Sequence, residues 1–238
     1  FNTGYRGYMG AMDAALYSIE TNPVFRFDVW KLHFSVGAVL SYLSRGDSHA
    51  MHFYPDVRMD LRLFKDRLNV FAGVKGGDRL NSYSSLKAAN HHFNMGYALI
   101  GQEDILSCTR EFYNAFAGLG GSIGSVFQYN LVAGHSKIGS DALLAADKWG
   151  NASLVLSDYN MDYIDATTTV KTNPVDFSLG LHFKHTDIDK SLALTLPVLS
   201  SDASLVWNWH RRFFAGASFE MVSARVSEAY SMDPFFNL

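Results

Sequence analysis

The segment FYPDVRMDLRL, residues Phe53–Leu63, decides the fold of this chain, because apolar and charged side chains alternate along it. Most of its odd positions are apolar, and its even positions Asp56, Arg58, Asp60 and Arg62 are all charged. Alternate side chains of a β-strand point to opposite faces. The segment therefore predicts a strand with one apolar face and one face that carries a ladder of alternating charge.

Two further segments, Trp30–Tyr42 and Val175–Lys184, repeat this alternation. All three are longer than the average strand of a soluble protein, which has about 5–6 residues. They match the about 9–11 residues that a strand needs to cross a membrane. Their length favours the wall of a transmembrane barrel over a soluble sandwich.

The cost of placing charge in lipid orients the predicted strands. Lys or Arg on the lipid face at mid-bilayer costs about 2–4 kcal/mol, so the charged ladder is predicted to face a polar lumen. Other residues predicted to face the lumen are Lys31, His33, Asp176, His182, Lys184 and Glu220. Residues predicted to face lipid are Leu32, Phe34, Val36, Val57, Met59, Leu61, Phe177, Leu179 and Leu181.

Composition excludes several classes of protein. The 238 residues are 48% hydrophobic and only 18% charged, with a formal net charge of -3. This content of apolar side chains excludes intrinsic disorder, and the lack of basic runs argues against nucleic-acid binding. Cys108 is the one cysteine, so a disulfide scaffold is excluded. The uncharged stretch 112–136 contains too many glycines for a membrane helix, and two strands explain it better.

The connections give a second line of evidence for an antiparallel up-and-down barrel. Short turns on one membrane side should alternate with long loops on the other. Short turns are predicted at 22–23, 65–67, 120–121, 173–174 and 210–212, and longer breaks at 45–50, 77–109, 137–160 and 186–195. We expect at least ten strands in this chain, and ten to fourteen in the whole barrel.

The chain is expected to be one domain over residues 1–238 and to be incomplete at one or both ends. Aromatic residues favour the headgroup level of a membrane. A girdle is predicted from Trp30, Trp207, Trp209 and Phe213.

Candidate sites are few, and each has a structural alternative. The ladder from Asp56 to Arg62 either lines a selective pore or forms a charge network that rigidifies a narrow lumen. His91-His92 lacks acidic residues or cysteines at ligand spacing, so no metal site and no cofactor are expected. His33, His182 and His210 suit an outer-membrane hydrolase only if a nucleophile lies nearby, and no catalytic signature is present.

Several motifs resemble a family. The stretch 57–86, VRMDLRLFKDRLNVFAGVKGGDRLNSYSSL, is followed by Asn90. Further pieces are REFY at 110–113 leading to GLGG at 118–121, LSDYNM at 156–161, and LP at 196–197 followed by WNWHRR at 207–212. Together they resemble outer-membrane β-barrel proteins of Bacteroidota, either generic outer-membrane proteins or barrels like TonB-dependent receptors. The resemblance implies a location in the outer membrane and a barrel fold, and no cargo.

The main functional hypothesis is therefore a non-enzymatic outer-membrane barrel. It would act as a structural or accessory subunit of a larger envelope complex for barrel assembly, secretion or uptake. The expected partners are the lipid bilayer, lipopolysaccharide and other outer-membrane or periplasmic proteins, with no nucleic acid. A passive channel or transporter for small solutes is the alternative. A hydrolase and a soluble lipocalin-like barrel are further alternatives.

Overall fold

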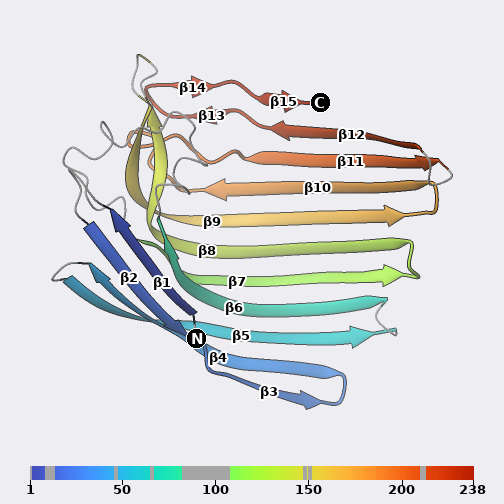
Figure 1. The fold of residues 1–238 in the computed structure, drawn as a ribbon, viewed down its shortest axis with the longest axis horizontal. Coiled ribbons are helices and arrows are strands. Elements are labelled where there is room, and N and C mark those ends of the chain that lie inside the picture. Colours follow the sequence, from blue (N-terminus) through green and yellow to red (C-terminus); the bar gives the residue numbers. More distant parts are fainter. Residues whose placement is uncertain are drawn as a thin grey trace.

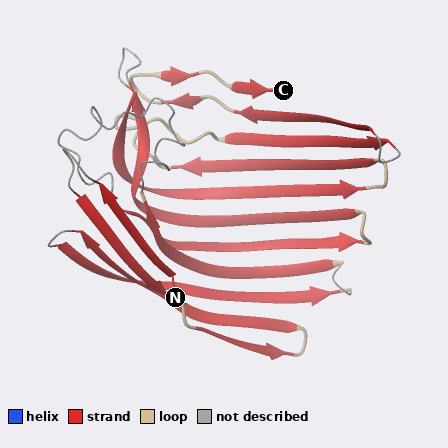
Figure 2. Ribbon diagram, in the orientation of Figure 1, coloured by secondary structure: helices blue, strands red, loops and turns tan. Residues whose placement is uncertain are grey.

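The structure, a computed structural model, describes residues 2–8, 14–45, 48–64, 67–81, 108–146, 149, 152–209 and 213–238. These residues form strands and connections, as Figures 1 and 2 show. A 13-stranded antiparallel sheet runs in the order β1-β2-β4-β5-β6-β7-β8-β9-β10-β11-β12-β15, and β3 pairs with β4. The chain therefore folds as the all-β, antiparallel up-and-down wall that its sequence predicts.

The strands of the sheet follow one another along the chain as hairpins. They are β1 (Asn2–Tyr8), β2 (Ala14–Thr21), β3 (Val24–Val29), β4 (Leu32–Arg45), β5 (Ser48–Leu63), β6 (Leu68–Leu80), β7 (Cys108–Ile123), β8 (Phe127–Ala146), β9 (Ala152–Lys171), β10 (Val175–Thr186), β11 (Leu199–Trp209), β12 (Phe213–Val222) and β15 (Phe235–Asn237). A separate hairpin joins β13 (Arg225–Val226) to β14 (Ser231–Met232).

The register of the strands separates polar from apolar side chains. Residues paired across an antiparallel ladder share a face. One row of paired residues, from β4 to β10, is Leu32, Leu61, Val70, Leu119, Leu131, Ala166 and Leu181. A row on the other face, from β5 to β12, is Arg62, Asn69, Gly120, Asn130, Thr167, Gly180, Asp202 and Glu220. We call these the apolar face and the polar face.

The turn predicted at Asn22-Pro23 is wrong. β2 and β3 both pair with β4 in the same direction, so residues 22–23 interrupt one long strand line. The reversal comes instead at Trp30-Lys31, where Trp30 has a positive φ of 57°. Lys31 therefore lies in a hairpin turn and not on the lumen face of a strand.

Two other predicted boundaries are also wrong. Gly120-Gly121 lies inside β7, and the chain reverses around Gly124, whose φ is +63°. The predicted break at 137–160 is occupied by the outer halves of β8 and β9, which are 20 residues each. Apolar residues at consecutive positions, such as Leu143-Leu144 and Leu154-Val155, and the register shift between Ile138 and Asp141 remove the alternation that would reveal these strands.

The remaining turn predictions have mixed outcomes. The structure has β10 begin at Val175, directly after the predicted turn at 173–174, and the predicted break at 186–195 is the β10–β11 connection. The predicted break at 45–50 is narrower than expected, since β4 ends at Arg45 and β5 begins at Ser48. Residues 65–66, 82–107 and 210–212 lie outside the described residues, so the turn at 210–212 and His91-His92 are not placed.

A small core lies at the end of the sheet next to the long connections. Residues 187–198, which join β10 to β11 and which we call the strap, bury Ile188, Ala193 and Leu194. The side chains of Ile188 and Ala193 cluster with Leu143 and Tyr159 of β8 and β9. The Leu194 N–H donates to the Leu144 carbonyl over 2.8 Å, and the Thr195 N–H donates to the Val226 carbonyl over 3.0 Å. The strap is therefore fixed between the β8–β9 extension and the β13–β14 hairpin.

Among the described residues, no pairing joins β1 to β15, so the sheet is curved but not closed. No helix of the described part of the chain is long and apolar enough to cross a membrane.

Candidate functional site: the polar face of the sheet

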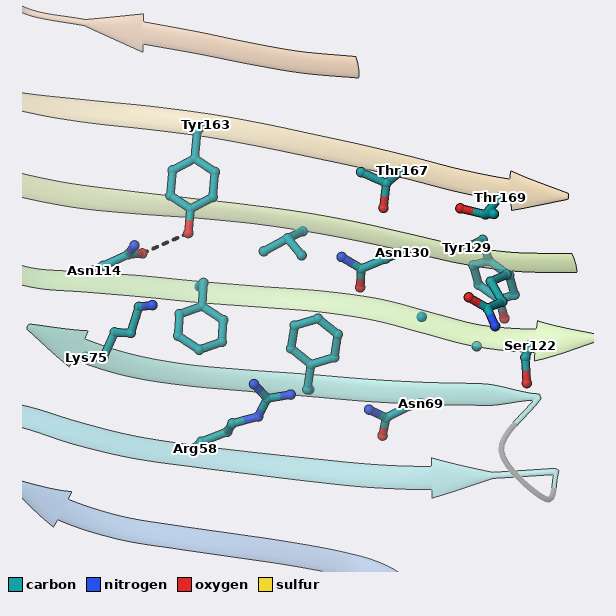
Figure 3. A pocket seen from close by; sticks show the side chains of 16 residues that line it. Arg58, Asn69, Lys75, Asn114, Ser122, Tyr129, Asn130, Tyr163, Thr167 and Thr169 are labelled. Atoms are coloured by element: carbon teal, nitrogen blue, oxygen red, sulfur yellow. Dashed lines mark hydrogen bonds between the residues drawn. The ribbon is translucent and has the colours of Figure 1, made fainter. Parts of the chain in front are cut away.

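The polar face carries a hollow of about 690 Å³ that is lined by β5 to β9. Figure 3 shows side chains of these strands around it. Most of the lining groups are amides and hydroxyls, among them Asn69, Asn114, Asn130, Thr167 and Thr169. Arg58 and Lys75 are the charged members, and none of the described lining residues is acidic. The wall therefore offers many neutral hydrogen-bonding groups and two cations.

Aromatic rings on this face lie against glycines of neighbouring strands. A Cβ on Gly118 would lie 2.6 Å from the ring of Phe71, and one on Gly134 would lie 2.6 Å from the ring of Tyr163. Because glycine has no Cβ, the rings pack close to the backbone. The hollow stays open at these points although large side chains line it.

The charged ladder pairs mainly within its own strand. The Arg58 Nε and Nη2 atoms donate to the two carboxylate oxygens of Asp60, each over 2.8 Å. The guanidinium also lies 5.0 Å from the ring centroid of Phe71, and the Asn69 amide donates to Asp60 over 3.3 Å. Arg58 is thereby neutralised by a bidentate partner.

Two groups mark the outer end of the hollow. The Tyr163 hydroxyl donates to the Asn114 side-chain carbonyl over 2.8 Å, across β8. Lys75, on β6, is exposed and extends from that strand over the hollow (Figure 3). Within the described part of the chain Lys75 has no ion-pair partner. Its ladder partner on β5 is Asp56, whose carboxylate accepts a hydrogen bond from Asn22 over 2.7 Å.

A strip of acidic residues and histidine lies beyond the hollow, on β9 to β12. The Nδ1 atom of His182 lies 2.6 Å from Asp165, and its Nε2 atom lies 3.3 Å from Asp202. Asp202 is paired in register with Glu220. On the polar face, β5–β6 therefore carry Arg58, Arg62 and Lys75 against Asp56 and Asp60, whereas β9–β12 carry Asp165, Asp176, Asp202 and Glu220 against Lys171 and Lys184.

A second hollow, of about 510 Å³, lies nearer the strap. In its wall, the Asp141 carboxylate accepts hydrogen bonds from Arg79 (2.8 Å), Thr109 (2.9 Å) and Tyr159 (2.7 Å). Burial, followed by the charge of Asp141, raises the pKa of Tyr159 above its ordinary value. Burial likewise raises the pKa of the nearby Cys108 thiol to about 12. This cluster is a hydrogen-bonded structural network around Asp141, and the raised pKa keeps the Cys108 thiol protonated.

The structure brings most of the predicted lumen residues to one face. The residues Asp56, Arg58, Asp60 and Arg62 share the polar face with His33, Asp176, His182, Lys184 and Glu220. The residues predicted to face lipid lie on the apolar face: Leu32, Phe34, Val36, Val57, Met59, Leu61, Phe177, Leu179 and Leu181. Their contact with lipid stays a prediction.

The predicted girdle lies at the edge of the sheet next to the short turns. Trp30 is 81% exposed, and Trp207 and Phe213 are also exposed. Trp209 pairs with Phe213 in the β11–β12 ladder, and its side chain lies outside the described part of the structure. Their placement at a membrane surface stays a prediction.

Sequence reasoning missed the groups that line the hollow on β6 to β9, including Lys75, Asn114 and Tyr163. The signal was present, because the apolar alternation at 68–74 already puts Asn69 and Lys75 on the opposite face. Three or more His, Cys, Asp or Glu side chains do not gather in a metal-binding arrangement among the described residues.

Comparison with known proteins identifies the fold of this sheet. No protein-family model matches the sequence, and no curated protein matches it significantly. Solved structures do match. The copper transporter OprC superimposes with a TM-score of 0.61 at 13% identity, covering 94% of this chain and 38% of that one.

Two further structures superimpose over a similar range. The FrpB iron transporter from Neisseria meningitidis gives a TM-score of 0.63 at 10% identity, over 94% of this chain and 36% of that one. The siderophore receptor PiuA from Acinetobacter baumannii gives 0.64 at 5% identity, again over 94% and 36%. The fold is that of an outer-membrane β-barrel.

This outer-membrane barrel chain spans little more than a third of the length of the structures that it matches. Its apolar face runs across β4 to β10, which suits a hydrocarbon environment. The fold and this surface place the chain in a bacterial outer membrane, as the sequence predicts.

Proposed function

We propose that this chain forms part of the wall of an outer-membrane barrel that takes up small polar solutes. The observation that carries the proposal is the hollowed polar face, which is rich in amides and hydroxyls and lies opposite a continuous apolar face. Water-filled or solute-binding lumens need such polar linings, whereas a lumen filled by its own side chains does not. The matched structures are transporters and receptors for metals and siderophores, which supports uptake as the general class.

We also propose that the chain is not an enzyme. The best-placed histidine, His182, has its Nδ1 beside Asp165 and its Nε2 beside the carboxylate of Asp202. A nucleophilic hydroxyl would have to occupy one of these places in a hydrolase. The proposed partners are lipid and lipopolysaccharide. A Bacteroidota origin and a role as accessory subunit of an envelope complex stay predictions.

A matched pair of variants tests the uptake proposal. Asn130 lines the hollow, and its neighbour Leu131 lies on the apolar face and is 41% exposed. The experiment reconstitutes the full-length protein in lipid vesicles and measures the permeation of a panel of labelled sugars, amino acids and metal chelates. Asn130→Phe should lower permeation severalfold because its ring fills the hollow, whereas Leu131→Phe should leave it unchanged.

Two results of the same experiment would contradict the uptake proposal. Vesicles that carry the protein and pass none of the solutes would overturn the proposal. Equal permeation through Asn130→Phe and the unsubstituted protein would also overturn it, because the solute path would then avoid this face. Correct folding of both variants is checked by the shift in gel mobility on heating.

A further inference from the structure

The distribution of charge around the hollow is unequal. The whole chain has a formal net charge of -3, yet the hollow has cations at one end and no described acidic residue in its lining. Asp60 neutralises Arg58 through two hydrogen bonds, so Lys75 is the remaining charged residue of the lining. Asp56 lies opposite Lys75 in the β5–β6 ladder, but its carboxylate accepts a hydrogen bond from the Asn22 side-chain amide over 2.7 Å. A solute with one negative group would therefore be favoured near Lys75.

The rest of the lining indicates what else the solute carries. Asn130 and Thr167 are paired across β8 and β9, and Gln128 pairs with Thr169 one step along. Side-chain amides and hydroxyls both donate and accept hydrogen bonds. A solute with many hydroxyl groups matches such a surface, because each hydroxyl also donates and accepts.

Apolar surface in the hollow favours the same class of solute. The rings of Phe71 and Phe116 line the hollow with their centroids 6.3 Å apart. Phe71 is buried and the Arg58 guanidinium lies 5.0 Å from its ring centroid, so the half-buried ring of Phe116, which packs against Gly73, is the apolar surface open to a solute. The C–H faces of a sugar ring pack against aromatic rings of this kind. The hollow, at about 690 Å³, lies within the range of about 300–1,000 Å³ usual for small-molecule sites.

The acidic strip sets the orientation of the solute. Asp165 and Asp202 flank His182 on the neighbouring strands, and Glu220 is paired with Asp202. These carboxylates repel an anionic group from the β9–β12 side of the polar face. A negatively charged end would therefore point toward β6, where Lys75 stands.

We propose that the hollow binds a short acidic oligosaccharide, with a carboxylate of the sugar at the Lys75 ammonium and its hydroxyls on the Asn130–Thr167 row. This assignment rests on the proposed uptake function and names its solute class. Lys75 sets the preference for charge, and the amide and hydroxyl wall binds the neutral part of the ligand.

Calorimetric titration of the full-length protein in detergent tests the proposal with defined probes. The probes are a trisaccharide of galacturonic acid, the neutral galactose trisaccharide of the same linkage, and inorganic phosphate. We expect the acidic trisaccharide to bind about tenfold more tightly than the neutral one, as for a charge-assisted hydrogen bond. This preference should shrink as salt is added.

Variants separate the two parts of the site. Lys75→Met should abolish the preference for the acidic trisaccharide and leave the weaker binding of the neutral one. The matched control is Lys171→Met, because Lys171 lies on β9 outside the hollow and pairs with Asp176. It should keep the preference. Thr167→Val should weaken both trisaccharides alike, by severalfold.

Three results would overturn the proposal. They are equal binding of both trisaccharides to the unsubstituted protein, a preference that survives Lys75→Met, and binding of phosphate as tight as that of the acidic sugar. If neither trisaccharide binds while Asn130→Phe still blocks vesicle permeation, the uptake function stands and only the solute class falls.

Discussion

The half of the sheet next to the short turns and the half next to the strap differ in where their polar side chains lie. In the first half, β4 to β10 pair without a break in register up to Lys75, and one face is mainly apolar while the other carries the charged and amide side chains. At the same level across the sheet, the register shifts between Lys75 and Gly77, Glu111 and Tyr113, and Ile138 and Asp141. Beyond this line, Asp141 and Thr109 are buried polar groups.

The difference shows how the surrounding medium shapes one continuous sheet. In hydrocarbon, a charged or polar side chain on the outer face is costly, so strict alternation is maintained. Beyond the membrane, water reaches both faces, and bulges that redirect side chains become tolerable. There, the fold is stabilised by a strap and by a hydrogen-bonded network in place of lipid.

The largest effect should come from breaking the alternation in the membrane half. Leu179 lies on the apolar face of β10, and Ser178 lies beside it on the polar face. Leu179→Arg should lower the free energy of unfolding in lipid vesicles by about 2–4 kcal/mol, the cost of Arg near the bilayer midplane. Ser178→Arg should change it far less. Urea denaturation of both variants measures this, and equal losses would contradict the assignment of the two faces.

A smaller effect should come from the network in the outer half. Tyr159→Phe removes the hydroxyl that donates to Asp141 over 2.7 Å. A buried carboxylate that loses a donor costs about 1–3 kcal/mol, so the strap and β9 should open more readily. Hydrogen exchange of the backbone amides of the strap measures this. Tyr17→Phe, at an exposed tyrosine of β2, is the control, and similar exchange in both variants would refute a stabilising role for the network.

The smallest effect concerns pH at the root of the strap. Burial opposes ionisation of Asp187, but hydrogen bonds from the Asn160 backbone and side-chain amides lower its pKa overall. A carboxyl whose pKa is lower in the folded state stabilises the fold above its unfolded pKa, near 4. This stabilisation is lost as the pH falls through the lower, folded-state pKa.

Hydrogen exchange of the Asn160 backbone amide, corrected for the intrinsic pH dependence of exchange, measures this loss of stabilisation directly. Protection should be steady above pH 5 and should decline in acid. In Asp187→Asn, protection should be lower and should not change over the same range. A decline that persists in this variant would assign the acid sensitivity to another group.

The sequence predicted the membrane half well, and the comparison explains why. At Asp56–Arg62, every second residue lies on the apolar face, so alternation alone reveals both the strand and its faces. At 137–160 the alternation is absent, so the sequence predicts a loop where the structure has the long extensions of β8 and β9. Ser140, with a φ of 53°, lies within the bulged part of β8, where no alternation survives.

The site was only half predicted for a related reason. The charged ladder was visible because its residues are ionised, but its pairing was not, since Arg58 bonds to Asp60 two residues along and not to a neighbouring strand. Lys75 and Asn130 come from weaker strand patterns. Their meeting with Phe71 around one hollow depends on the registers of β6 with β7 and of β7 with β8, which no local sequence pattern contains.

The interruption at Asn22-Pro23 has a consequence for this edge of the sheet. Pro23 has no amide hydrogen, so a change of strand direction at this residue leaves no backbone donor unpaired there. The Pro23 carbonyl still accepts a hydrogen bond from the Ala38 N–H over 3.3 Å. Figure 1 shows β1 and β2 running at an angle to β3 and β5. Because β4 pairs with both β2 and β3, this edge of the sheet bends at Asn22-Pro23 and keeps its ladder on both sides of the bend.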